Sequence, residues 1–372
     1  MESQLVDDPA ALAELAEAWD ALAVANRLPL AAPGVVEAWW RHLAPGRARL
    51  RVVAVRDGGE LVGLAPLWAR GRDVRLAGTE LFNGLAPLAA GGREDEVAAA
   101  VARELARAGP DLLLLEGIPA DAPWPRLLRE RWPGERRPAA FEREVISAPV
   151  AHLRPAFDEW MGTRSKNFRS QMRRARRQLD DDGGAVRAAT PETLRDDLEA
   201  LRVLHESRWE GRGASNLAPY GGALVEGLEA AGRALGPERF RLWVVEVEGA
   251  PAAAHLFVAA GGVVTYWNGG WDERHARYKP ALLSILAAVE EACGHGDDLF
   301  DLGAGENAYK QRFADGDEPL AWRGLIAPGP RALLTRARLS PRAARRVVKR
   351  VLPEPVRERA RSVLTRTRRP AG

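Results

Sequence analysis

The chain has 372 residues, 46% of them hydrophobic and 28% charged, an ordinary globular composition at a length where one core usually gives way to two domains. No apolar run approaches the length needed to span a bilayer, and the single cysteine, Cys293, excludes an internal disulfide. Fourteen Lys and Arg against two Glu give residues 331–372 a net charge of +12, so the first 330 residues carry −9 of the total +3.

The first half of the chain shows helical and strand patterns that alternate. Apolar residues recur at helical spacing near the start, and Asp57–Gly58–Gly59 then separates two apolar runs, which is typical of a β-hairpin. The predicted elements, in order, are helices at 9–25 and 35–43, strands at 50–56 and 61–69, a helix at 94–108 and a strand at 111–115.

The middle of the chain carries a basic helix that begins at Ser165. Its apolar residues share one face and its arginines another, so two interpretations stay open. The basic face is either simply solvated, or Ser165, Lys166, Arg169 and Arg173 point into an inter-domain cleft and bind an anionic acceptor or a donor phosphate.

A further helix, predicted at 192–210, runs into a glycine-containing loop. Trp209 and Arg212 lie at the start of this loop. The loop is either a substrate lid or a surface loop anchored by one tryptophan, and both interpretations stay open.

In the second half, three apolar runs between residues 241 and 271 are separated by glycines and predict antiparallel strands. A helix follows from Pro280, and the short strand 299–302 feeds a glycine loop at Gly303–Gly305. A strand that opens onto a helix N-terminus predicts an anion site, and Arg274, Arg277 and Lys279 supply cations beside it.

The two halves are similar to one another. The stretch that starts at Arg51 and the stretch that starts at Arg241 both have an apolar strand, a charged position, a turn glycine and a second strand rich in small residues. Because a helix and a strand follow in both cases, we interpret the pattern as an internal duplication.

The second half resembles the BioF2-like (CelD-type) acetyltransferases of the GNAT superfamily, which are similar to the FemAB-type aminoacyl transferases. The loop Arg277–Ala281 departs from the wider GNAT pattern because it contains no glycine. The residues that carry the resemblance are Tyr266, Gly269, Asp272, Tyr278–Pro280, Leu282–Leu283, the run FDLG at 300–303, Gly305, Tyr309–Lys310, Phe313 and, earlier in the chain, Trp209, Arg212, Gly213 and Ser215.

The resemblance implies an α/β fold of the α+β mixed-sheet kind, with tandem GNAT-like domains packed around an inter-domain cleft. We expect an N-terminal GNAT-like domain at 1–147, a C-terminal acyltransferase domain at 148–330, and a basic helical or disordered tail at 331–372. It also implies an N-acyltransferase that uses acyl-CoA, such as acetyl-CoA, to acylate a small-molecule amine. The acceptor would be an amino sugar or an envelope or exopolysaccharide precursor.

Acyl transfer to an amine needs a base, an oxyanion donor and an acid for the leaving thiolate. The candidate catalytic residues are Asp301, Glu306 and Tyr309. The expected CoA contacts are Arg274, Arg277, Tyr278, Lys279, Pro280, Ala281 and Leu282, and the expected substrate contacts, besides those of the basic helix and the 209–212 loop, are Tyr266, Asp272 and Lys310. His255, on a central strand, is expected to be a satisfied core residue.

Two other functions fit the same residues. One is a FemAB-like transferase fed by aminoacyl-tRNA, the only setting in which we expect a nucleic-acid partner. The other is a non-catalytic scaffold with degenerate GNAT-like domains.

The remaining expectations concern metals and location. The six His and one Cys lack ligand spacing, so no metal site is predicted. The first ten residues lack a basic and then apolar signal pattern, so we expect a cytoplasmic protein. The tail 331–372 either docks on an anionic membrane surface, caps the acidic body, or is disordered.

Overall fold

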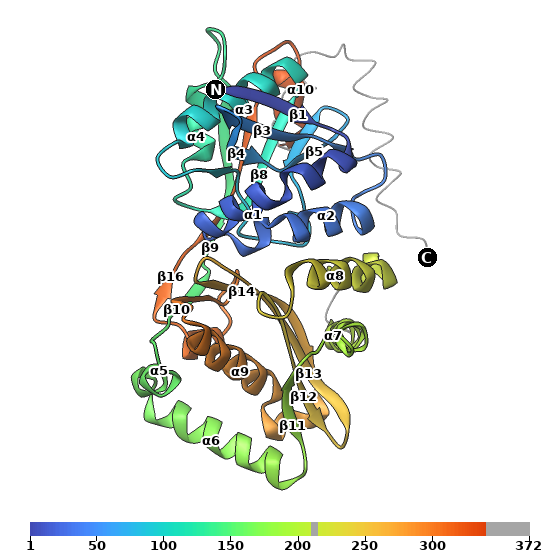
Figure 1. Ribbon diagram of the computed structural model, residues 1–372, viewed down its shortest axis with the longest axis vertical. Helices are drawn as coiled ribbons and strands as arrows, with labels where there is room; N and C mark the ends of the chain where they lie inside the picture. The colour runs from blue at the N-terminus through green and yellow to red at the C-terminus, as the bar shows by residue number, and fades with distance from the viewer. Residues whose placement is uncertain (210–214, 340–372) are drawn as a thin grey trace, which may run out of the picture.

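The computed structural model describes residues 1–209 and 215–339 and stacks two α/β halves on one another (Figure 1). The predicted α/β class with mixed sheets is confirmed. The helices of the described ranges are α1 (Ala16–Ala25), α2 (Pro33–His42), α3 (Glu94–Ala108), α4 (Trp124–Glu130), α5 (Phe157–Thr163), α6 (Lys166–Asp181), α7 (Leu194–Trp209), α8 (Gly222–Leu235), α9 (Pro280–His295) and α10 (Ala332–Leu339).

The first half contains two sheets that meet at Pro66. This proline lacks the N–H that a continuous ladder would need, and the chain passes there from β4 to β5. One sheet has the order β1 (Glu2–Val6), β3 (Val52–Asp57), β4 (Glu60–Ala65), β7 (Leu88–Ala89). The other has the order β2 (Arg49–Leu50), β5 (Leu67–Arg70), β6 (Asp73–Leu76), β8 (Leu112–Pro119), β17 (Leu320–Ile326), β9 (Ala139–Ile146).

The second half is built on one seven-stranded sheet. The predicted antiparallel strands β12, β13 and β14 form its centre, and the helix predicted from Pro280 is α9. The order of the sheet is β11 (Ala185–Ala188), β12 (Phe240–Val247), β13 (Ala250–Ala260), β14 (Val263–Trp271), β15 (Leu299–Asp301), β10 (Pro149–His152), β16 (Gly316–Asp317).

One strand crosses from the second half to the first. β17, from the end of the second half, lies between β8 and β9 of the first half and is antiparallel to both. β10 begins the second half and lies between β15 and β16 of its own sheet. Backbone hydrogen bonds of β17 therefore join the halves, and the division at residue 147 stays a prediction because the six-stranded sheet takes a strand from beyond it.

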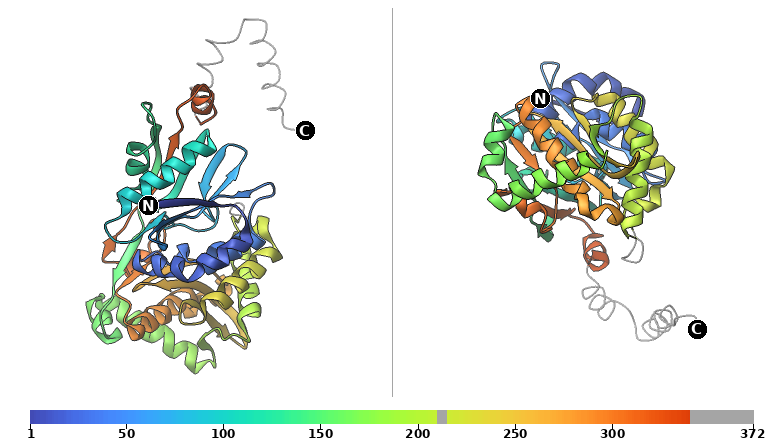
Figure 2. Two further views of the ribbon diagram at one scale, coloured as in Figure 1. Left: turned by 45° about the horizontal axis from the view of Figure 1, so that its top comes forward. Right: turned by 90° about the horizontal axis from the view of Figure 1, so that it is seen from below.

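The halves also share one core. Helix α2 of the first half packs against α8 of the second, and α1 and α7 lie beside them, so these four helices form the central layer (Figure 1). One cluster of buried side chains runs through this layer, from Trp39 on α2 to Leu198 on α7 and Val258 on β13. The outer faces of the sheets are covered by α3 and α4 in the first half and by α5, α6 and α9 in the second. Figure 2 shows the same stacking from two further sides.

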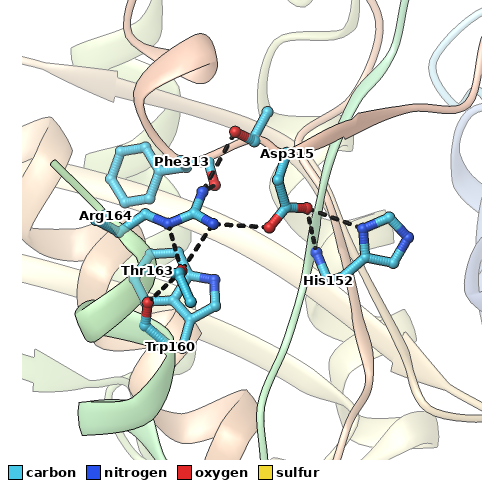
Figure 3. Close-up of polar contacts among 7 residues, drawn as sticks. His152, Trp160, Thr163, Arg164, Phe313 and Asp315 are labelled. Atoms are coloured by element: carbon cyan, nitrogen blue, oxygen red, sulfur yellow. Dashed lines mark hydrogen bonds and ion pairs between the residues drawn. The ribbon is translucent and has the colours of Figure 1, made fainter.

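Hydrogen bonds among His152, Arg164 and Asp315 hold the end of strand β10 in place (Figure 3). The carboxylate of Asp315 accepts hydrogen bonds from the backbone N–H of His152 at 2.9 Å and from the guanidinium of Arg164 at 2.7 Å. Nδ1 of His152 lies 2.8 Å from the same carboxylate, and Arg164 also donates to the carbonyl of Phe313. The end of β10 is thereby tied to the segment that leads into β16.

The tail begins with α10, which packs on the first half. Ala332 and Leu339 lie on a small apolar cluster of the six-stranded sheet in the first half. Arg331 forms an ion pair with Asp111 at 3.8 Å, and Arg338 forms one with Asp73 at 2.6 Å. This part of the tail therefore caps acidic residues of the body. Residues 340–372, the rest of the predicted tail, lie outside the described residues. Within the described ranges no helix combines the length and apolar character needed to cross a membrane.

Candidate active site

The strands β14 and β15 run parallel over a short distance and then diverge. Three consecutive residue pairs join them, the last being Thr265 with Asp301, where β15 ends. β14 continues along β13, with a bulge that leaves Trp267 without a partner residue on that strand. The backbone of the sheet therefore opens directly beyond Thr265 and Asp301.

A cavity of about 450 Å³ lies at this divergence, between the two halves. Its walls come from the end of α7, the middle of β14 and the segment 301–310, and the first half adds Leu30, Leu81 and Asn83. The indole N–H of Trp267 donates to the carbonyl of Leu81 at 2.9 Å, which fixes the bulged strand against the first half. The predicted inter-domain cleft therefore exists and contains residues of both halves.

Asp301 is the acidic group at the point of divergence. Its Oδ1 accepts a hydrogen bond from the N–H of Gly303 at 2.7 Å, and Thr265 is its partner residue on the neighbouring strand. Burial raises the pKa of Asp301 to about 6, although the bond from Gly303 and the charge of Lys310 act in the other direction. Such a carboxylate is mostly ionised at neutral pH, yet basic enough to take a proton from a reacting amine.

Lys310 lies behind the glycine loop, with 3% of its surface exposed. Its Nζ donates to the carbonyls of Gly303 at 2.8 Å and Ala304 at 2.7 Å. Burial lowers the pKa of Lys310 to about 8, against the attraction of Asp301. The structure thus gives Lys310 a role in holding the loop, and its expected contact with a substrate stays a prediction.

Two tyrosines stand in the cavity wall. They are Tyr266 on β14 and Tyr309 after the glycine loop. Burial raises the pKa of Tyr309 and raises that of Tyr266 well above 10, so both carry their protons at neutral pH. Tyr309 can therefore donate a proton or a hydrogen bond. Glu306, the third candidate for catalysis, is exposed and does not line the cavity.

Helix α7 reaches the cavity because Gly270 lets it lie directly on β14. A Cβ at Gly270 would stand 2.2 Å from the backbone nitrogen of His205. This close approach places Nδ1 of His205 3.2 Å from the carbonyl oxygen of Gly269 and brings Arg208 and Trp209 to the same wall. Trp209, 39% exposed, therefore lies beside the cavity, and its expected contact with a substrate stays a prediction.

The start of α9, where the sequence predicts a phosphate site, is not part of this cavity, since none of residues 274–282 lines it. The hydroxyl of the buried Tyr278 donates to Asp182 at 2.6 Å, and the guanidinium of Arg277 lies 4.5 Å above its ring. Arg274 pairs with Asp272 at 2.6 Å, and this hydrogen-bonded pairing lowers the pKa of that carboxyl. These side chains are engaged with one another.

Few backbone N–H groups are available at this helix start. Lys279 has a left-handed backbone (φ 53°), and Pro280 has no N–H. The N–H groups of Lys279, Leu282 and Leu283 bond to the carbonyls of Ala276 and Lys279. Among residues 279–283, all of which the structure describes, the N–H of Ala281 alone is without a hydrogen-bond acceptor.

The basic helix α6 does not face the inter-domain cleft, so that expected position is wrong. Its apolar side packs against α9, at the end of the second half remote from the first (Figure 1). Ser165 caps the helix by accepting from the N–H of Phe168 at 3.2 Å, and Arg169 donates to the carbonyl of Gly162 at 2.8 Å. Lys166 and Arg173 are exposed. Arg212 lies outside the described residues.

A second cavity, of about 780 Å³, reaches Asp301 from another side. It shares Thr265 and Asp301 with the first cavity and is also lined by the carboxylates of Asp121, Asp317 and Glu318. Asp301 can therefore be approached by two separate molecules.

The sequence analysis did not assign Thr265, His205 or Arg208 to the site. The polar run before Trp209 at the end of a helix was a usable signal for the last two, whereas Thr265 becomes significant only through its pairing with Asp301. Within residues 1–209 and 215–339, no group of three or more His, Cys, Asp or Glu side chains is arranged to hold a metal ion.

Comparison with known proteins agrees with this geometry. Residues 166–311 match the family model described as an Acetyltransferase (GNAT) domain, a range that contains β14, α9, β15 and most of the cavity wall. No curated protein matches the chain.

Among solved structures, FemX superposes with a TM-score of 0.61 at 13% identity, covering 88% of this chain and 98% of FemX. L-PGS from Bacillus licheniformis superposes with a TM-score of 0.53 at 12% identity, covering 86% of this chain and 92% of that one. At these identities the likeness concerns the fold. Residues 166–311 are thus similar to the GNAT acetyltransferase family, and the fold of the chain is similar to the folds of FemX and L-PGS.

Proposed function

We propose that this protein is an N-acyltransferase that moves an acyl group from acyl-CoA to a primary amine at Asp301. The observation that supports this most directly is the position of that carboxylate, at the divergence of two parallel strands and in the walls of two cavities. A transfer reaction requires donor and acceptor to meet in one orientation, and two approaches to one basic group provide for that.

In the proposed reaction the amine nitrogen attacks the thioester carbonyl carbon. The carboxylate of Asp301 takes the proton that the nitrogen loses, the C–N bond forms and the C–S bond breaks. The thiolate leaves and receives a proton from Tyr309, which is protonated at neutral pH. The products are an amide and free CoA; Asp301 then gives its proton to solvent, and Tyr309 takes one proton back from solvent, so both groups return to their starting states.

The second cavity has the charge expected for an acceptor that carries an amine. Three carboxylates besides Asp301 line it, and Arg27, the one cation in its lining, is 2.8 Å from Asp298 in an ion pair. An ammonium group would therefore be attracted to this side and could lose its proton next to Asp301. An amino sugar or a polysaccharide precursor, the acceptor class implied by the BioF2-like resemblance, fits this description.

The start of α9 favours a second candidate for the donor, an aminoacyl-tRNA. A pyrophosphate bound at a helix N-terminus needs several free N–H groups, and Ala281 alone offers one there. The fold is also shared with FemX, in line with the resemblance to the FemAB-type transferases. In this alternative the same Asp301 chemistry acts on an ester in place of a thioester.

One experiment tests the proposal and separates the donors. The full chain is incubated with acetyl-CoA or longer acyl-CoAs and a panel of primary amines, and free CoA is measured against Asp301→Asn. Turnover that the variant abolishes is the expected result. Turnover with aminoacyl-tRNA alone would assign the second donor, and a wild-type protein inert with both would refute the transferase function.

A further inference from the structure

His205 has one ring nitrogen engaged and one free. Nδ1 lies 3.2 Å from the carbonyl oxygen of Gly269, and since a carbonyl can only accept, Nδ1 carries the hydrogen. Nε2 is then an acceptor. It is buried, and among the described residues it has no hydrogen-bond partner; the nearby Asn216 side chain lacks the geometry for one.

The surroundings keep this histidine neutral. The residue is 5% exposed, and burial lowers the pKa of His205, against the opposing effect of the Gly269 carbonyl. A neutral imidazole with a buried, unpaired acceptor carries a desolvation cost in the empty protein. That cost disappears when a ligand in the cavity places an N–H against Nε2.

We propose that Nε2 of His205 is a binding contact of the 450 Å³ cavity and accepts a hydrogen bond from an N–H group of a bound substrate. The proposal rests on the proposed function for the identity of that substrate. The shared chemistry is an N–H donor, which the amide groups of a pantetheine arm and the amino group of the acceptor both supply. The cationic Arg208 in the same wall favours an uncharged N–H at this point.

Two substitutions separate the two nitrogens of the ring. His205→Asn keeps a donor for the carbonyl of Gly269 but has nothing in the place of Nε2. His205→Gln can place its carbonyl oxygen near the Nε2 position and so keep an acceptor. His295→Asn is the matched control, since His295 is exposed on α9 and its Nδ1 also lies beside a backbone carbonyl, that of Glu291 at 3.0 Å.

Binding is measured with CoA alone and with a primary amine alone, together with the ¹⁵N shift of Nε2 in the wild type and the KM of each substrate. We expect His205→Asn to weaken one of the two ligands about tenfold, His205→Gln to restore most of that loss, and His295→Asn to change nothing. A change confined to CoA assigns the contact to the donor arm, and a change confined to the amine assigns it to the acceptor.

Stability of the empty protein provides a readout that is independent of turnover. Because His205→Asn keeps the bond to Gly269 and exchanges the buried Nε2 acceptor for a buried amide oxygen, we expect its melting temperature to stay close to that of the wild type. Unchanged affinities for both ligands in His205→Asn, or an Nε2 shift that neither ligand moves, would overturn the proposal. Ligand binding that depends on His205 without any turnover would instead refute only the proposed function.

Discussion

Thr265 on β14 and Asp301 on β15 form the last residue pair before two parallel strands diverge. The pairing places the carboxylate of Asp301 at the edge of the opening, where its Oδ1 accepts a hydrogen bond from the N–H of Gly303. Thr265 is thereby a positioning residue for the base.

The first prediction concerns Asp301→Asn. An amide cannot take the proton of the attacking amine, so we expect turnover to fall by a factor of about 10² to 10⁴ with the fold retained. In the wild type, kcat/KM should rise with pH through about 6, the pKa of Asp301, because only the ionised form acts as a base. A pH–rate profile checks both statements, and a variant with wild-type turnover would exclude Asp301 as the base.

The same carboxyl should make the folded protein less stable as pH rises. Its pKa is raised on folding, so its stabilising contribution is complete below the ordinary value of 3.8 and is lost as pH rises through about 6. Asp301→Asn should therefore be more stable than the wild type at pH 8, by up to about 3 kcal/mol. Denaturant unfolding at pH 5 and pH 8 measures the difference.

Much of the second half could be predicted from its sequence because its signals are local. Glycines separate β12, β13 and β14, and Pro280 marks the start of α9. His255 was expected to be a satisfied core residue, and its Nδ1 lies 2.7 Å from the hydroxyl of Ser284. Asp301, the last residue of β15, and Tyr309 both line the cavity, and their predicted catalytic roles stay predictions.

The crossing of β17 into the first half could not be predicted, since nothing in the composition of this strand says which sheet it joins. Its pairing depends on where the other half ends in space, which is a property of the whole chain. The amphipathic pattern of α6 likewise indicated a buried and a basic face, but not which side of the sheet the helix would cover. Because the apolar face of α6 packs against α9, the basic residues Arg169 and Arg173 face away from the cleft.

A second prediction concerns the contact between α7 and β14. A Cβ at Gly270 would stand 2.2 Å from the backbone nitrogen of His205, and a backbone atom cannot move aside without shifting the helix. Gly270→Ala should therefore destabilise the protein by about 2–4 kcal/mol and reduce turnover through displacement of His205 and Arg208.

The matched control is Gly294→Ala on α9. This glycine faces open space and lies in a helix, so alanine should stabilise by about 0.5–1 kcal/mol. Thermal unfolding of the two variants gives the comparison. Equal stability of Gly270→Ala and the wild type would contradict the close packing of α7.

The third prediction tests the start of α9 as a phosphate site. If CoA phosphates lie at Lys279, Lys279→Glu should abolish the rise in melting temperature that acyl-CoA causes, because a carboxylate repels the pyrophosphate. Arg103→Glu, on the exposed side of α3 and far from both cavities, controls for the charge change. A shift that survives Lys279→Glu would place the phosphates elsewhere or favour the tRNA donor.

The fourth prediction concerns residues 340–372, which carry most of the positive charge of the tail. Each basic residue near an anionic bilayer adds about 1 kcal/mol of attraction, so deletion of this segment should release the protein from anionic vesicles. Turnover should be retained, because both cavities are formed by residues before 340. Co-sedimentation with anionic and neutral vesicles measures binding; equal sedimentation of both chains would exclude membrane docking through this segment.

The fifth prediction concerns the cluster of His152, Arg164 and Asp315, which holds the end of strand β10. Burial alone would raise the pKa of Asp315, but hydrogen bonds from His152 and Arg164 outweigh that effect and hold it below its ordinary value. The stability that this carboxylate provides is therefore present above about pH 4 and is lost as pH falls through its lowered pKa.

Asp315→Asn should lower the melting temperature at pH 7 by about 2 °C or more, and this loss should shrink as the pH is lowered below 4. Asp158→Asn, at an exposed position on α5, should leave the melting temperature nearly unchanged throughout. If the loss of melting temperature in Asp315→Asn stays constant down to pH 2, the ionised carboxylate is not what holds β10 against the segment that leads into β16.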